Sequence, residues 1–318
     1  MSRIVELTNI IIVAAVIPLM LLISLLAEGV DRKIYARMQR RIGPPVIQPI
    51  YDIIKLAGKE RIIPVTAKKA VFISTPYIAF LFSSTALAIP VATLILGVSI
   101  PGDLILLAYM TVTVALMFIV AGAVSGNPYS SIGMSRSIIM MLAYEIPVLA
   151  SLIIVAVKAG LTLSLFNIIT IQVEAGAPLA FIYPSIILTA AVFLFCMPAA
   201  AEAQPFDIPA AKTEIIHGVL TEYTGLYLAL FKLAKANHIM FLNILTVLLF
   251  FYPAIIPLQL DWLALIIILI LSLVIRFLTV TIPRAVFARV KITQALKLYW
   301  LISGILLTAS IILLGLGV

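Results

Sequence analysis

Long apolar stretches recur along the chain from residue 10 to residue 317, and the short segments between them contain most of the charged residues. A helix of about 20 apolar residues is long enough to cross the hydrocarbon core of a bilayer. The pattern predicts spans over 8–28, 71–97, 103–124, 138–157, 182–200, 218–252, 262–282 and 299–317. We therefore expect an all-α, polytopic membrane protein with about eight transmembrane helices, in which residues 1–318 form a single transmembrane domain.

The sixth span is ambiguous, because residues 218–235 and 239–256 could form two crossings or one long, tilted or broken helix. The loop 31–69 contains ten of the twenty-one Lys and Arg residues, and the positive-inside rule places it in the cytoplasm. Eight crossings keep the other basic loops on that side, whereas nine crossings would move the loop 283–298 outside. We therefore expect eight crossings, with both termini external.

Composition supports a membrane protein, since 64% of the residues are hydrophobic and only 11% are charged, compared with about 25% charged in soluble domains. The net charge of +8 is carried by loops, where it suits anionic lipid or a cytoplasmic partner better than nucleic acid. The single cysteine, Cys196, lies in an apolar run. We expect no metal site or iron–sulfur cluster in this chain alone, so any redox cofactor would lie on a partner.

The first basic loop contains Gly43-Pro44-Pro45 and then an expected helix from Gln48 to Glu60. Its apolar residues, at i, i+3, i+4 and i+7 spacing, predict an interfacial helix with Ile50, Ile53, Ile54 and Ala57 on one face and Gln48, Asp52, Lys55 and Lys59 on the other. The loop either anchors the chain on the membrane surface or docks a soluble subunit. Gly43-Pro44-Pro45 makes this exposed loop more rigid than contact with lipid requires, which favours docking. The expected docking residues are Arg32, Arg37, Arg40, Arg41, Gly43, Pro44, Asp52, Lys55, Lys59 and Glu60.

Ionisable residues lie within or beside several predicted spans, where a charge is costly and is a functional candidate by default. Glu145 lies in the fourth span, and the prolines around Glu202 and Asp207 predict a loop there. We expect one helix to follow and to carry the later groups into the apolar phase, as a proton path requires. The expected ion-coupling relay is Glu145, Glu202, Asp207, Glu214, His217, Glu222, Lys232 and Lys235.

Lys232 and Lys235 need counter-charges if they lie inside the membrane. Glu222, Glu145 or acids of another subunit are candidate partners, and a lysine beside a carboxylate could act as an electrostatic switch. Alternatively, both lysines extend their ammonium groups toward the membrane surface. We also expect Arg276, late in the seventh span, to pair internally.

Taken in order, these motifs resemble the H-type membrane subunit family of respiratory complex I and of group 4 membrane-bound hydrogenases. The matching segments are Asp31-Arg32-Lys33, Gln39 to Pro44, Gln48-Pro49, Tyr144-Glu145-Ile146-Pro147, Pro205-Phe206-Asp207-Ile208-Pro209 and Glu222-Tyr223-Thr224-Gly225. The resemblance implies a non-catalytic membrane subunit of an oxidoreductase complex in a prokaryotic cell membrane. Iron–sulfur clusters, with or without a nickel–iron centre, would lie on peripheral subunits, and antiporter-like and small membrane subunits would be its neighbours.

Departures from the complex I pattern point to the hydrogenase branch. The segment from Gly43-Pro44 to Gln48-Pro49 is shorter than in quinone-reducing members of the family. Ala210 and Lys212 stand where those members usually carry acids, and Lys235 stands where they usually carry glutamate. The resemblance therefore implies no quinone site. The chain looks closest to the M subunit of membrane-bound hydrogenase or to its ferredoxin-dependent sulfur-reducing relative.

These observations predict a membrane-anchor and ion-coupling subunit that docks a peripheral redox arm and relays its energy to proton or sodium translocation. A quinone-chamber subunit of a complex I-like NADH or ferredoxin dehydrogenase is the alternative within this class. An autonomous secondary transporter is the alternative from another class, although the sequence lacks the internal repeat that many such carriers show. A lipid-modifying enzyme is a further alternative, for which the sequence offers no nucleophile–base pair or metal-binding motif.

Overall fold

The computed structural model describes residues 2–97, 101–253 and 261–317, without the side chains of residues 2–14, 212, 213, 261 and 262. These ranges form helices joined by loops and contain no β-strand, which confirms the all-α prediction. The helices are α1 (Ser2–Met38), α2 (Gln48–Ala57), α3 (Lys69–Leu96), α4 (Asp103–Val124), α5 (Pro128–Lys158), α6 (Leu165–Ala175), α7 (Leu179–Ile182), α8 (Pro184–Ala200), α9 (Lys212–Ile215), α10 (Gly225–Phe250), α11 (Asp261–Arg276), α12 (Ile282–Val286) and α13 (Ile292–Gly315).

Among the described residues, six helical segments are long and apolar enough to cross a membrane: α3, α4, α5, α10, Leu263–Val286 and α13. They coincide with the second, third, fourth, sixth, seventh and eighth predicted spans. The first and fifth predicted spans fall on α1 and on the shorter apolar helix α8. The polytopic architecture is thus confirmed, and the count of eight spans stays a prediction.

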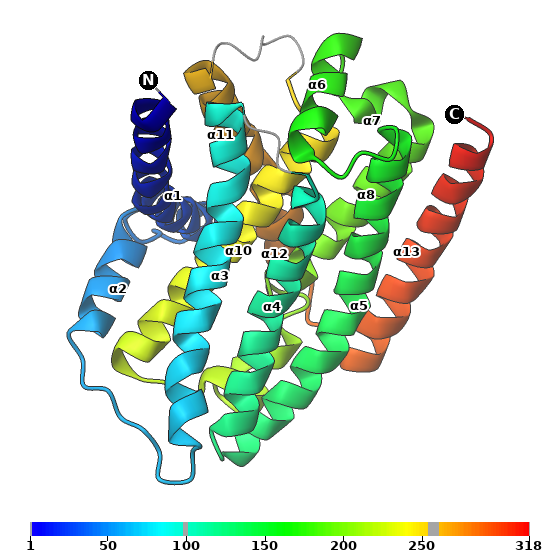
Figure 1. Cartoon of the computed structure of the whole chain (residues 1–318). Helices are drawn as coiled ribbons and strands as arrows, with labels where there is room; N and C mark the ends of the chain where they lie inside the picture. Colours follow the sequence, from blue (N-terminus) through cyan, green and yellow to red (C-terminus); the bar gives the residue numbers. More distant parts are fainter. Residues whose placement is uncertain (1, 98–100, 254–260, 318) are drawn as a thin grey trace.

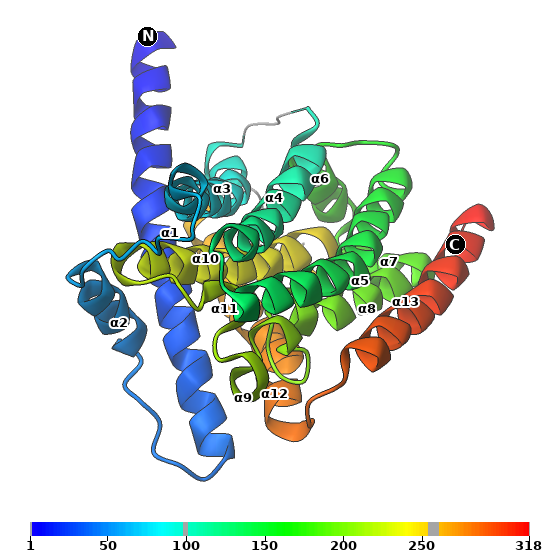
Figure 2. The same cartoon turned by 90° about the horizontal axis from the view of Figure 1, so that it is seen from below.

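The central element is α10, whose side chains are mostly buried and which packs against α3, α1, α11 and α8. Helices α3, α4, α5, α8 and α13 follow from left to right in Figure 1, and α13 lies at the outer edge against α5 and α8. Figure 2 shows α1 along its length, whereas it shows α3 nearly end-on. Helix α1 is therefore strongly tilted relative to α3. The N-terminal end of α1 and the C-terminal end of α13 are drawn at the upper end of Figure 1.

The lower part of Figure 1 carries the loops 58–68, 125–127 and 201–224, whereas the loops 39–47 and 287–291 are drawn at mid-height; we call the region of these five loops the basic end. Both chain ends are drawn away from the basic end, and the side of the membrane that they face stays a prediction. The prediction that residues 31–38 belong to the first loop is wrong, because α1 continues to Met38. The loop then folds back so closely that a Cβ on Gly29 would lie 1.8 Å from the Val46 carbonyl oxygen.

The segment after α8 also differs from its prediction, since no single helix carries Glu214, His217 and Glu222. It contains a 3-10 turn at Ile208–Ala210, the four-residue α9, a second 3-10 turn at Gly218–Leu220 and only then α10. Gly218 has a φ of +57°, and a Cβ there would lie 2.0 Å from the Pro209 carbonyl oxygen. This close approach of two backbone segments requires glycine and stops the helix. Beyond it, α10 is one continuous helix, which resolves the ambiguity over residues 225–250.

Candidate functional site

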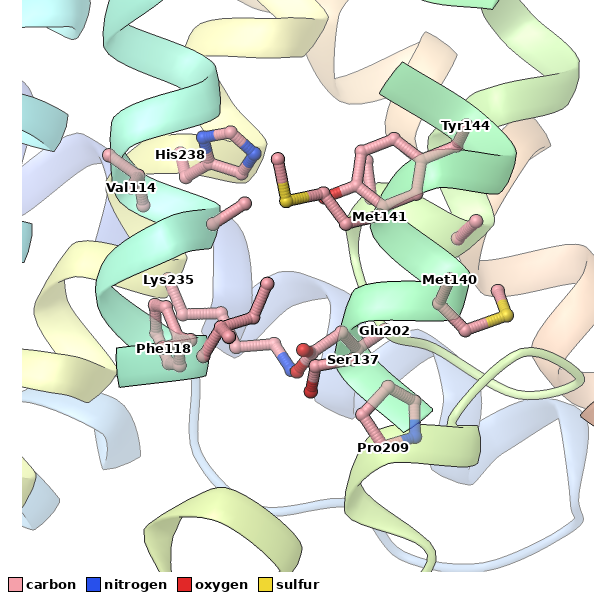
Figure 3. A pocket seen from close by; sticks show the side chains of 14 residues that line it. Val114, Phe118, Ser137, Met140, Met141, Tyr144, Glu202, Pro209, Lys235 and His238 are labelled. Carbon is pink, nitrogen blue, oxygen red and sulfur yellow. The ribbon is translucent and has the colours of Figure 1, made fainter. Parts of the chain in front are cut away.

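A cavity of about 40 Å³ lies between α4, α5, α10 and the end of α8. Its polar side chains are Ser137 and Tyr144 on α5, Lys235 and His238 on α10, and Glu202 just after α8 (Figure 3). Apolar side chains of α4, α5 and α8, together with Pro209, complete the wall. We call it the charged cavity. A space of this size holds a few water molecules.

An ion pair lies at one side of the charged cavity. Lys235 Nζ is 2.6 Å from Glu202 Oε2, and the two side chains are 33% and 22% exposed. Figure 3 shows their charged ends pointing toward each other beside Ser137. A lysine next to a carboxylate was expected, but the candidate partners of Lys235 were Glu222, Glu145 or acids of another subunit. The structure corrects this assignment to Glu202.

The turn after α8 brings Glu202 to this position. The helix ends at Ala200, and the Ala203 amide donates back to the Pro198 carbonyl at 3.0 Å. Glu202 has a φ of +45°, in the left-handed region that non-glycine residues seldom adopt. Such a residue reverses the chain direction at a helix end. The Glu202 side chain consequently faces α10 instead of the solvent.

Glu145 is buried, at 4% exposure, but it does not line the charged cavity. It follows Tyr144 on α5, and one residue turns the side chain by about 100° around a helix. Tyr144 faces the cavity, whereas Glu145 lies within electrostatic range of Cys196 on α8. Its Oε2 atom is buried without a hydrogen-bond partner among the described residues.

The other acids of the predicted relay are paired at the basic end instead of forming a row into the membrane. His217 is exposed there as well. The relay residues therefore do not all share one site, and their role in ion coupling stays a prediction. The observed pairs are Asp207 with Arg289 at 2.6 Å, Glu214 with Arg136 at 2.5 Å, and Glu222 with the Nδ2 group of Asn127.

Two of the predicted docking residues tie α2 to α1. Arg32 pairs with Glu28 at 2.5 Å and with Asp52 at 2.8 Å, and Lys232 interacts electrostatically with the same Asp52 carboxylate. Burial raises the pKa of Asp52, but the hydrogen bonds from Arg32 and Gln48 outweigh it and hold that pKa below its usual value. The polar side of α2 thus faces the protein at Asp52, while Ile54 of the predicted apolar face is exposed.

The remaining docking candidates form the outer surface of the basic end. Gly43 and Pro44 are half-buried, and a Cβ on Gly43 would lie 3.0 Å from the Lys33 Cα atom, so the loop packs tightly against α1. The exposed candidates are Arg37, Arg40, Arg41, Lys55, Lys59 and Glu60.

Sequence reasoning missed two sites. Asp31 is buried, accepts a hydrogen bond from Thr281 and lies 3.5 Å from Arg284, so it holds α1 against the end of the seventh span. Arg276 is also buried there and interacts electrostatically with Asp31, but its Nε and Nη1 atoms have no hydrogen-bond partner among the described residues. Its internal pairing therefore stays a prediction.

His238 is the second omission. Its spacing of three residues from Lys235 places both on one face of α10 and could have identified it.

No group of three or more His, Cys, Asp or Glu side chains in the described ranges could hold a metal ion. The charged cavity and its ion pair can instead hold and move protons, because they combine an acid, a base and room for water.

Comparison with known proteins gives a consistent family. Residues 10–315 match the family described as NADH dehydrogenase. The chain is 30% identical over 310 residues to the H-type subunit of NADH-quinone oxidoreductase from Paramagnetospirillum magneticum, a match that covers 91% of this chain and 85% of that relative. It is 33% identical over 261 residues to the corresponding subunit from Rickettsia rickettsii, covering 79% and 75%. The fold matches a chain of the membrane-bound sulfane sulfur reductase, an archaeal respiratory membrane complex, with a TM-score of 0.84 and 26% identity over 95% of this chain and 99% of that chain.

Proposed function

Because this chain belongs to the NADH dehydrogenase family of H-type membrane subunits, and is thus a membrane subunit of a respiratory oxidoreductase complex, we propose that it anchors a peripheral redox arm and couples electron transfer to ion translocation. The observation that carries the coupling role is the ion pair of Glu202 and Lys235 beside the charged cavity. The chain needs no catalytic centre of its own for this role.

The ion pair has two protonation states of similar shape. In one, Lys235 keeps its proton and both groups are charged; in the other, the proton has moved from Lys235 Nζ to Glu202 Oε2 and both groups are neutral. Coulomb interactions between partly buried groups are screened less than those in bulk water. A change of charge on a redox subunit docked at the basic end would therefore shift the balance between these states.

The basic end supports docking of that subunit. Arg37, Arg40 and Arg41 are exposed next to Ile42, which is fully exposed, and Val65 of the neighbouring loop is fully exposed too. Cationic groups around isolated apolar side chains are complementary to an acidic surface with an apolar centre. The loop that contains Val65 also contacts the start of α10, because the Ile62 amide donates to Oγ1 of Thr224, the residue just before this helix, at 3.2 Å. Docking would thus act close to the helix that carries Lys235.

Within the family, we assign the chain to the hydrogenase and sulfur-reducing branch. The fold match to the sulfane sulfur reductase chain supports this choice, as do the short loop before Gln48 and the lysine at position 235. Ferredoxin would supply the electrons. Iron–sulfur clusters, with or without a nickel–iron centre, would lie on peripheral subunits, and protons or sodium ions would move through antiporter-like neighbours.

The test uses the intact complex in proteoliposomes and measures ions moved per electron pair. Glu202→Gln and Lys235→Met each remove the proton exchange, so we expect the ratio to fall at least about tenfold while electron transfer continues. Lys297→Met, at an exposed position of α13, is the matched control. An unchanged ratio in both cavity variants would refute the coupling role.

A quinone-chamber subunit is the second candidate, because the curated relatives are named as subunits of NADH-quinone oxidoreductases. The charged cavity of about 40 Å³ is much smaller than the roughly 300–1,000 Å³ of small-molecule sites. A quinone would therefore have to bind in a chamber shared with another subunit or in the apolar cavity of about 370 Å³ between α4 and α5. Labelling of this chain by a photoreactive quinone in the intact complex would favour this candidate over the first.

A further inference from the structure

His238 is a buried titratable residue that the predicted relay did not include. It lies on α10, three residues after Lys235, and is 6% exposed. The helical rise places it about 4.5 Å further along the helix axis than Lys235. Figure 3 shows its ring at the wall of the charged cavity, on the far side from the Glu202–Lys235 ion pair.

The charged cavity has both the room and the polar groups for ordered water. A cavity needs roughly 10–15 Å³ of space for each water molecule that it holds. About three water molecules therefore fit into the cavity of about 40 Å³. Ser137 Oγ lies in its wall and is buried without a hydrogen-bond partner among the described residues. Buried hydroxyls are normally satisfied, and water is the available partner here.

His238 also senses the charge of the ion pair. It interacts electrostatically with Glu202 and with Lys235. Tyr144 on α5 is the other titratable side chain that lines the cavity, and the α4 residues that line it are apolar. While Lys235 is protonated, its charge opposes a proton on His238. Once Lys235 has passed its proton to the cavity water, and not to Glu202, the remaining Glu202 carboxylate favours a proton on His238.

We propose that His238 is the next proton carrier beyond the ion pair and is reached through water in the charged cavity. The Lys235 Nζ–H bond breaks as a water molecule takes the proton, and a proton of the water chain forms the N–H bond of the His238 imidazolium. The summed charge of Glu202, Lys235 and His238 stays constant, and no electrons are exchanged. This inference rests on the proposed coupling function and adds the direction of proton movement along α10.

The experiment compares His238→Gln with Lys297→Met, the exposed control on α13, in the intact complex in proteoliposomes. We expect His238→Gln to lower the number of ions moved per electron pair at least about tenfold, with electron transfer retained. The Lys297→Met variant should match the wild type. Redox-induced infrared difference spectra give a second readout, because the imidazole bands of His238 should vanish in His238→Gln and persist in Lys297→Met.

The outcomes separate the inference from the proposed function. A wild-type ratio and unchanged imidazole bands in His238→Gln, together with impaired Glu202→Gln, would overturn the inference and leave the function standing. A wild-type ratio in Glu202→Gln and Lys235→Met would overturn the function itself. If His238→Gln does not assemble, Ser137→Val replaces it, since the larger side chain fills the water space and should cause the same loss; normal coupling there would also overturn the inference.

Discussion

The identity of residue 235 sets the electrostatics of the charged cavity. Glutamate in place of Lys235 would put two carboxylates where an ion pair of 2.6 Å now lies. Like charges at that distance cannot both ionise, so one group would keep a proton and the exchange would stop. We expect Lys235→Glu to lower ions moved per electron pair at least about tenfold.

The swapped variant, Glu202→Lys with Lys235→Glu, is the control for this prediction. It restores opposite charges at the same two positions, so the number of ions moved per electron pair should return to within about threefold of the wild type. If the single and the swapped variants lose coupling equally, the pair acts through packing and not through charge.

Glu145 tests whether the relay extends beyond the charged cavity. Glutamine preserves its volume and removes its titration, so Glu145→Gln should leave assembly intact and impair ion movement if the carboxyl carries protons. Glu222→Gln is the companion variant, at a half-buried position that already accepts a hydrogen bond from Asn127. Normal ion movement in both variants would limit the relay to the cavity residues.

The chemistry of single residues was readable in the sequence, whereas their partners were not. Glu202 and Lys235 were identified because charges are rare in apolar segments. Their contact depends on the left-handed backbone conformation of Glu202, which no local sequence pattern predicts. His238 was missed because an isolated histidine is an ambiguous feature until its neighbours are known.

At the scale of elements, long apolar helices were the most predictable. Helices α3 and α4 begin and end within about two residues of their predictions, an ordinary margin for helix boundaries. Helix α5 begins ten residues early, at Pro128. Asn127 accepts a hydrogen bond from the Tyr129 amide at 2.8 Å, and asparagine followed by proline is a readable helix start. The eleven-residue α6 was missed because it is too short for a span.

The segment between α8 and α10 yields a prediction about stability. Gly218→Ala would place a Cβ 2.0 Å from the Pro209 carbonyl oxygen, at a φ of +57°. The left-handed conformation alone costs a non-glycine residue roughly 1–2 kcal/mol, and the overlap adds to it. We expect a Tm several degrees lower and a smaller yield of assembled complex.

Gly304→Ala is the matched control, because a Cβ there meets no atom within 4 Å. It lies inside α13, where alanine is a better helix former than glycine by about 1 kcal/mol. Its Tm should be unchanged or slightly higher. Equal Tm values for the two variants would show that the Pro209–Gly218 contact is not needed to hold the segment.

At the scale of the whole molecule, the sequence predicted the distribution of charge better than the path of the chain. The positive-inside rule grouped the basic loops at one end, and the structure places them together. Which side of the membrane they face stays a prediction. The tilt of α1 and its ion pairs to α2 and α12 were not predictable, since they connect segments far apart in the sequence.

The grouped charges lead to a prediction about assembly. Replacing Arg37, Arg40 and Arg41 together by glutamine removes three exposed charges from the basic end. Rim charges act mainly through long-range attraction, which is screened beyond about 8 Å at physiological salt. We therefore expect the peripheral arm to dissociate at a lower salt concentration, with at least about tenfold weaker retention at about 0.15 M salt, measured by native mass spectrometry of the purified complex.

A triple lysine variant at the same positions separates charge from geometry. Lysine keeps each positive charge but loses the planar, two-pronged hydrogen bonding of arginine. If attraction at a distance holds the arm, the lysine variant should retain it and the glutamine variant should not. If both lose it, specific bonds from the arginines to the partner hold it. If both retain it at every salt concentration, the loop contacts lipid and the arm docks elsewhere, and the coupling role of Lys235 would then need another route to the redox centre.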